Sequence, residues 1–135
     1  MHNLVYALIQ VIHNLGAVTV VSTAASALWL VCGNVAVQHR LAILLAVAWT
    51  IQAASGAGFG IATYSFEGHL PDIHGTALAA LFIKIVCAFA GFILAVTYVM
   101  AGAKWAANEH VLAWKVSLAL GITALGSAAF LRWFS

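Results

Sequence analysis

Two ionisable side chains, His13 and Lys84, lie inside strongly apolar stretches of this sequence. His13 belongs to the segment YALIQVIHNLGA at residues 6–17, and no Asp, Glu, Lys or Arg occurs anywhere in residues 1–39. Lys84 lies within the aliphatic run LFIKIV at residues 81–86. A neutral imidazole nitrogen can ligate heme iron or copper, and a buried ammonium group needs an anionic partner or the loss of its proton. These two residues are therefore the first candidates for a functional site.

The composition indicates which elements must position them. The chain has 135 residues, of which 65% are hydrophobic and only 6% are charged, whereas a soluble domain has about 25% charged residues. The uncharged intervals 1–39, 41–66, 85–103 and 116–131 are long enough to cross a hydrocarbon core of about 30 Å. The sequence predicts one all-α domain over residues 1–135, with membrane spans at about 4–32, 39–64, 73–103 and 109–133.

Short connections between these spans predict an integral membrane four-helix bundle with up-down-up-down topology in the lipid bilayer. No basic patch is present to neutralise phosphates, which excludes a nucleic-acid partner. No positively charged region precedes the first apolar stretch, so we expect that span to be retained rather than cleaved as a signal peptide. Cys32 and Cys87 lie in different spans, and we expect both to be small buried side chains rather than a disulfide or ligands.

Helical periodicity predicts which face of each span turns inward. In the first span one face carries polar groups among apolar ones: Tyr6, Gln10, His13, Asn14 and Ala17. In the third span one face carries mainly small residues around a lysine: Ala77, Ala80, Lys84, Ala88, Gly91, Ala95 and Tyr98. Polar and small residues face other helices in membrane bundles. His13 and Lys84 each lie about 15 Å from the same end of the bundle, so we expect them to face each other.

The second and fourth spans carry similar faces. One face of the second span holds Gln52, Ser55, Gly56, Phe59 and Thr63. One face of the fourth holds Ser117, Gly121, Ala124 and Ala128. Gly56 and Gly60 form a GxxxG pattern, which favours close helix contact, either within the bundle or with another subunit of a homo-oligomer or larger complex.

Charges near the connections predict the orientation. Arg40, Lys104 and Lys115 lie at one side of the bundle and Arg132 at the other. The positive-inside rule then places both termini outside, in a bacterial inner (plasma) membrane, together with the 65–72 connection, where Asp72 is a candidate helix cap. Aromatic side chains fit interfacial belts, namely Trp29, Trp105 and Trp114 inside and Trp133 outside, whereas Trp49 lies deeper and should pack between helices. His39 and His110 lie at the inner interface and are expected to be structural or lipid-facing.

His13 has several possible roles. It can ligate heme or a metal such as copper, or it can hydrogen-bond to polar groups of neighbouring helices. His74, at the start of the third span, is the best candidate for a second ligand, and His69 is the next. Because these two histidines lie on the outer side with His2, Glu67 and Asp72, they could also form a copper or zinc site there.

The chain resembles the four-helix membrane unit shared by the copper resistance protein D (CopD) family and the HemJ-type protoporphyrinogen oxidases. The likeness rests on VIHNLG at residues 11–16, on His39-Arg40-Leu41 with Ser55-Gly56, and on LFIKIV at residues 81–86. It departs where a tryptophan and a glycine usually follow the first histidine, because Thr19, Val20 and Val21 occupy that region here.

The resemblance implies two functions. A HemJ-like protein would bind heme b near the outer leaflet, with His13 as an axial ligand and Lys84 beside a heme propionate or a substrate carboxylate. Its role would be electron or proton transfer, including porphyrinogen oxidation. A CopD-like protein would handle copper through His13, His74 and His69. A third hypothesis, favoured by the small extramembrane mass, is a noncatalytic accessory subunit of a larger membrane complex.

Overall fold

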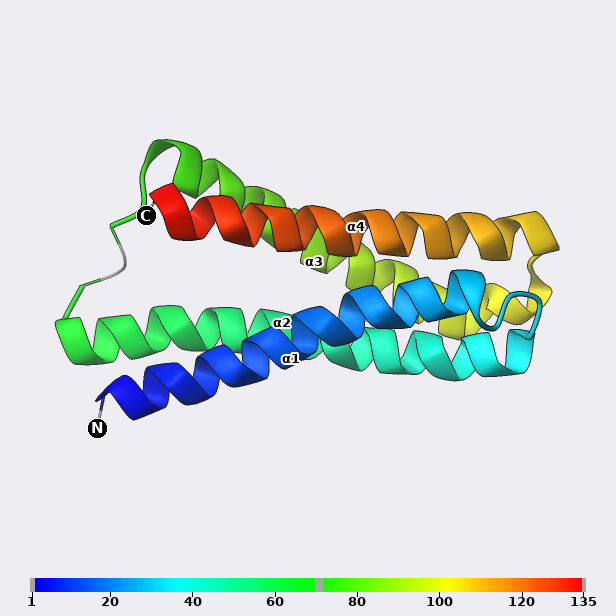
Figure 1. Cartoon of the computed structure of the whole chain (residues 1–135), viewed down its shortest axis with the longest axis horizontal. Helices are drawn as coiled ribbons and strands as arrows, with labels where there is room; N and C mark the ends of the chain where they lie inside the picture. Colours follow the sequence, from blue (N-terminus) through cyan, green and yellow to red (C-terminus); the bar gives the residue numbers. More distant parts are fainter. Residues whose placement is uncertain (1, 70–71, 135) are drawn as a thin grey trace.

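Four long helices make up almost all of the computed structural model, which describes residues 2–69 and 72–134. They are α1 (His2–Trp29), α2 (Val35–Glu67), α3 (Gly75–Ala101) and α4 (Ala107–Phe134), with a short 3-10 turn, η1 (Gly102–Lys104), after α3. Each long helix has the length and hydropathy to cross a membrane, and the described residues contain no strand. Successive helices run in opposite directions (Figure 1). The predicted all-α integral membrane four-helix bundle is confirmed.

The helix boundaries follow local capping chemistry. Gly33, with φ of 81°, turns the chain after α1, and the Asn34 side chain then accepts a hydrogen bond from Val37 N at 3.1 Å. This cap starts α2 at Val35, four residues before the expected start of the second span at residue 39. At the other end of the bundle, the residue preceding α3 is His74 rather than the expected cap Asp72, whose carboxylate instead pairs with the His74 imidazole.

The two ends of the bundle differ in how tightly the helices pack. We call the end with the α1–α2 and α3–α4 connections the closed end, and the end with both termini and the α2–α3 connection the open end (Figure 1). Toward the closed end, the Trp49 indole lies so close to Gly91 that a Cβ there would overlap it. A Cβ on Gly121 would lie 3.0 Å from Val20. The α2–α3 and α1–α4 interfaces are therefore closely packed at these levels.

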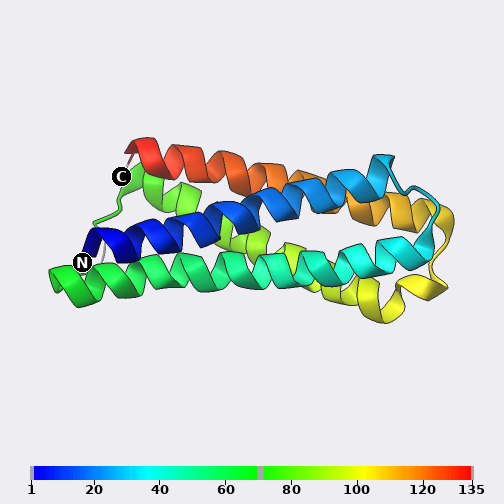
Figure 2. The same ribbon diagram turned by 60° about the horizontal axis from the view of Figure 1, so that its bottom comes forward.

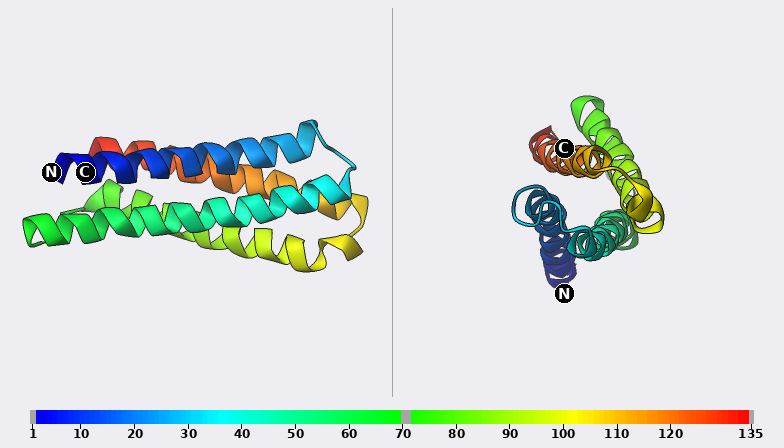
Figure 3. Two further views of the ribbon diagram at one scale, coloured as in Figure 1. Left: turned by 90° about the horizontal axis from the view of Figure 1, so that it is seen from below. Right: turned by 90° about the vertical axis from the view of Figure 1, so that its right-hand side faces the viewer.

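Toward the open end, the α1–α2 pair diverges from the α3–α4 pair (Figures 1 and 2). Gly56 lies two turns beyond Trp49 on the same face of α2, yet no described atom lies within 4 Å of a Cβ built on it. Asn14 lies two turns from Val21, which borders Gly121, and Asn14 is exposed. Both interfaces thus separate within about two turns, while α1 stays packed on α2 and α3 on α4 along the bundle (Figure 3).

Candidate functional site

The His13 imidazole joins three helices near the point where the bundle begins to open. Its Nε2 lies 2.8 Å from Lys84 Nζ on α3, and its Nδ1 lies 2.6 Å from Ser55 Oγ on α2. His13 is 8% exposed and Lys84 is half-buried. The predicted juxtaposition of His13 and Lys84 is confirmed. We call His13, Ser55 and Lys84 the open-end site.

The backbone around His13 is held by α2. Gln52 Nε2 donates to the His13 carbonyl oxygen at 2.5 Å. This contact depends on Gly16, because a Cβ there would lie 2.5 Å from the same Gln52 nitrogen. The Phe59 ring packs edge-on against the imidazole, with ring centroids 6.0 Å apart. The polar pair Gln52 and Ser55, three residues apart on one face of α2, therefore fixes both the backbone and the ring of His13.

The hydrogen-bond partners determine which nitrogen of His13 carries a proton. Ser55 has one hydroxyl hydrogen, and its Oγ donates to the Ile51 carbonyl oxygen at 2.6 Å. His13 Nδ1–H then donates to Ser55 Oγ, which leaves Nε2 as an acceptor for an N–H of Lys84. While this hydrogen bond holds, His13 is neutral and the pair carries at most one positive charge, on Lys84.

Among the residues that the structure describes, no carboxylate pairs with the Lys84 ammonium. The chain contains three carboxylic side chains, Glu67, Asp72 and Glu109, all near helix ends. Glu109 Oε2 accepts from Ala106 N at 2.7 Å, and Asp72 pairs with His74. Among the described residues, the hydrogen-bond partner of Lys84 is the neutral His13 imidazole. An anion that reaches a cation placed in this way in an apolar bundle stabilises it.

The other predicted ligands do not approach His13. His74 precedes Lys84 by ten residues, which is about 15 Å along a helix. Its side chain is 83% exposed, and that of His69, whose Nε2 lies 3.9 Å from Glu67 Oε2, is 67% exposed. Within residues 2–69 and 72–134, no three His, Cys, Asp or Glu side chains gather as a metal site would require. Metal ligation by His13 Nε2 would also require Lys84 to move away, so the arrangement as it stands does not fit a metal there.

The inward face expected for α1 is only partly correct. Gln10 and Asn14 are exposed, and Gln10 Nε2 donates to Asn14 Oδ1 at 2.7 Å. They turn away from the core because α4 has separated from α1 at this level. The face expected for α3 is correct, since its members are buried or half-buried. Gly56 on α2 is exposed rather than packed inside the bundle.

A second polar cluster, which the sequence reasoning missed, lies at the closed end. Gln38 Nε2 on α2 donates to the Ala27 carbonyl of α1 at 3.1 Å. Gln38 Oε1 accepts from Tyr98 on α3 at 2.9 Å, and the Tyr98 oxygen lies 2.6 Å from His110 Nδ1 on α4. This chain of hydrogen bonds links all four helices, and we call Gln38, Tyr98 and His110 the closed-end clamp.

Two expectations change because of this clamp. His110 is buried, at 6% exposure, so it is structural rather than lipid-facing. Trp114 is 1% exposed and packs on Tyr98 with ring centroids 5.0 Å apart, so it does not belong to an interfacial belt.

Trp49, as expected, is buried between helices, whereas Cys32 is exposed rather than buried. Helical spacing could have found His110, because the inward face of α4 at Ser117 and Gly121 extends back to it in steps of three and four residues.

Comparison with protein-family models, curated proteins and solved structures finds no match to this chain. The resemblance to the CopD and HemJ-type proteins therefore stays a prediction from the motifs alone.

Proposed function

We propose that this chain is a small membrane protein that binds a carboxylate-bearing ligand at the open-end site. The observation that carries the proposal is the Lys84 ammonium, half-buried in a membrane helix and hydrogen-bonded to a neutral imidazole at 2.8 Å. Its three N–H donors suit a carboxylate, and a charge-assisted hydrogen bond is about twice as strong as a neutral one.

Binding would change the state of His13. When Lys84 turns toward a ligand carboxylate, His13 Nε2 loses its donor and presents a free lone pair. Ser55 keeps the ring in place through Nδ1, so Nε2 can accept a hydrogen bond or a proton from the ligand. The site would thus couple anion binding to proton acceptance, which agrees with a role in proton transfer.

The test uses the detergent-purified protein and two fluorescent probes, pyrenebutyrate and pyrenebutanol, which share a pyrene ring and a four-carbon chain but end in a carboxylate and a neutral hydroxyl group. We expect the carboxylate to bind at least tenfold more tightly than the alcohol, and Lys84→Met to remove that difference, because a hydrogen bond to a charged group contributes about 1.5–3 kcal/mol. Lys115→Met, which removes an exposed lysine of α4, is the matched control. Equal binding of both probes, or full binding by Lys84→Met, would contradict the proposal.

Heme b is a second candidate ligand, as the family resemblance implies. One feature of the site favours it: Ser55 holds Nδ1, and ligating histidines are usually oriented by such a hydrogen bond on the other ring nitrogen. His13 would then hold the iron and Lys84 a propionate, once their mutual hydrogen bond has opened. A Soret band that is present in the purified wild type and absent from His13→Ala would support heme binding. Absence of the band from the wild type would rule heme out as the ligand.

Copper handling and an accessory role remain the other hypotheses. The described residues provide no ligand cluster for copper, so stoichiometric copper in the purified protein would be needed to support that hypothesis.

An accessory subunit is favoured by Gly56 and Gly60, since Cβ atoms built on them meet no described atom within 4 Å. Co-purification with a large membrane complex, lost in Gly56→Leu, would support it.

We propose that the open end faces outward, because Arg40, Lys104 and Lys115 lie toward the closed end. Cys32, an exposed thiol within the α1–α2 connection, provides a direct test in intact cells. A membrane-impermeant maleimide should leave Cys32 unlabelled until the membrane is permeabilised. Labelling of Cys32 in intact cells would show that the closed end, not the open end, faces outward.

A further inference from the structure

The register of α2 against α3 places open space beside Lys84. Trp49 of α2 packs on Gly91 of α3, and the two helices are antiparallel. Two turns toward the open end, Gly56 on α2 therefore comes opposite Lys84 on α3. A Cβ on Gly56 would meet no described atom within 4 Å, and the same holds for Gly60 one turn further on. The helices thus separate at the level of the lysine.

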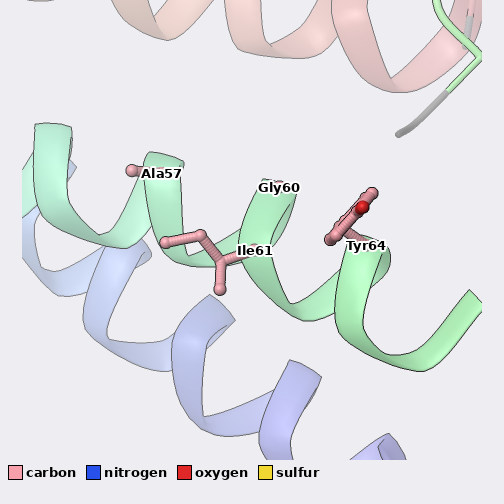
Figure 4. Close-up of a pocket in the computed structure, with 4 residues that line it drawn as sticks. All are labelled: Ala57, Gly60, Ile61 and Tyr64. Carbon is pink, nitrogen blue, oxygen red and sulfur yellow. The ribbon is translucent and has the colours of Figure 1, made fainter. Parts of the chain in front are cut away.

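The next turns of α2 border an open hollow of about 470 Å³, lined by Ala57, Gly60, Ile61 and Tyr64 (Figure 4). Sites for small organic ligands usually measure about 300–1,000 Å³. From Ala57 to Tyr64 the hollow follows α2 for about 10 Å. It is apolar except for the Tyr64 hydroxyl, and the cation nearest to its deep end in the helix register is Lys84.

We infer that this hollow holds the body of the ligand, and that the ligand is a flat, ring-containing apolar carboxylate. This inference rests on the proposed function, which supplies the anchoring of the carboxylate by Lys84. The floor of glycine and alanine lets a planar ring approach the α2 backbone closely. The Tyr64 side chain, on a residue 60% exposed, offers an aromatic face at the outer end for an offset-stacked ring.

Charge complementarity selects this occupant over a lipid chain or a partner helix. An acyl chain or an apolar helix in the hollow would bring no anion to the Lys84 ammonium, whose described hydrogen-bond partner is the neutral His13 imidazole. A ring that carries a carboxylate fills the apolar hollow and neutralises the lysine at once. The hollow is open, so such a molecule can enter from the side without unfolding the bundle.

The experiment measures pyrenebutyrate binding by fluorescence in Gly60→Leu and in the matched control Gly126→Leu. Gly126 of α4 also has no described atom within 4 Å of a built Cβ, but it lies outside the hollow. We expect Gly60→Leu to weaken binding at least tenfold and Gly126→Leu to leave it unchanged. Tyr64→Ala, which adds no bulk, should weaken binding about threefold through loss of stacking. Circular dichroism verifies that each variant is folded.

The outcomes separate this inference from the proposed function. If Gly60→Leu and Tyr64→Ala bind like the wild type while Lys84→Met does not, the hollow is not the ligand site but the lysine still is. If Lys84→Met also binds like the wild type, the proposed function fails as well. Equal binding of butyrate and pyrenebutyrate would show that the ring makes no contact and would overturn the inference alone.

Discussion

At the closed end, hydrogen bonds through Gln38, Tyr98 and His110 join all four helices, whereas at the open end Ser55, His13 and Lys84 join only three. The closed-end clamp contains no carboxylate, lysine or arginine. The open-end site contains a lysine without a carboxylate. This difference supports a stabilising role for the clamp and the proposed role of the open-end site in ligand binding.

The packing around the two ends explains this division. The largest fully buried side chains, those of Trp114, Leu45 and Val20, lie between the centre and the closed end. Toward the open end, α2 and α3 present Gly56 and Lys84 to each other without contact at Gly56. In a bilayer, helices are held together by close van der Waals packing and interhelical hydrogen bonds rather than by removal of apolar area from water. The helices pack less closely at the open end, so this end is less stabilised, but a ligand can reach it.

The largest effect should come from adding one methyl group at the closed interface. Gly91→Ala would drive a Cβ into the buried Trp49 indole, which has no room to move at 2% exposure. We expect a loss of about 3 kcal/mol in the free energy of unfolding, measured in detergent by denaturation followed by circular dichroism. Gly56→Ala, two turns along α2, should cost less than about 0.5 kcal/mol. Equal losses at the two glycines would contradict the described difference in packing.

The next effect should come from the closed-end clamp. Tyr98→Phe removes the hydroxyl and leaves Gln38 Oε1 and His110 Nδ1 buried without that partner. We expect a loss of about 2 kcal/mol by the same denaturation measurement. Tyr64→Phe, in which an exposed hydroxyl is removed, should change stability by less than about 0.5 kcal/mol. A Tyr98→Phe protein as stable as the wild type would show that the clamp does not hold the helices together.

A smaller effect is expected where Ser55 orients His13. Ser55→Ala removes the hydroxyl 2.6 Å from Nδ1 and should lower the free energy of unfolding by about 1 kcal/mol. Ser22→Ala is the control, because the Ser22 hydroxyl is exposed and donates to the Val18 carbonyl of its own helix. If both variants lose the same stability, the Ser55 hydroxyl contributes through its hydrogen bond to its own helix backbone rather than through that to the imidazole.

The sequence predicted the features of the fold that depend on local patterns. Apolar length gave four spans, and the small-residue face of α3 correctly turned Lys84 toward His13. The sequence could not predict the divergence at the open end, because helical periodicity around Gln10 and Asn14 is the same whether α4 is close or distant. The closed-end clamp was missed for a related reason: Gln38 and His110 lie next to connections, where polar residues usually face water.

The most direct test of the central claim is the shift in Tm that pyrenebutyrate causes in the wild type and in Lys84→Met, since a ligand that binds the folded state raises its stability. Without ligand, Lys84→Met should unfold at the same Tm as the wild type or higher, because it removes a charge that lacks a carboxylate partner. Saturating pyrenebutyrate should raise the Tm of the wild type and leave that of Lys84→Met unchanged. A lower Tm for Lys84→Met without ligand, together with equal shifts in both proteins, would mean that Lys84 is structural and would contradict the claim.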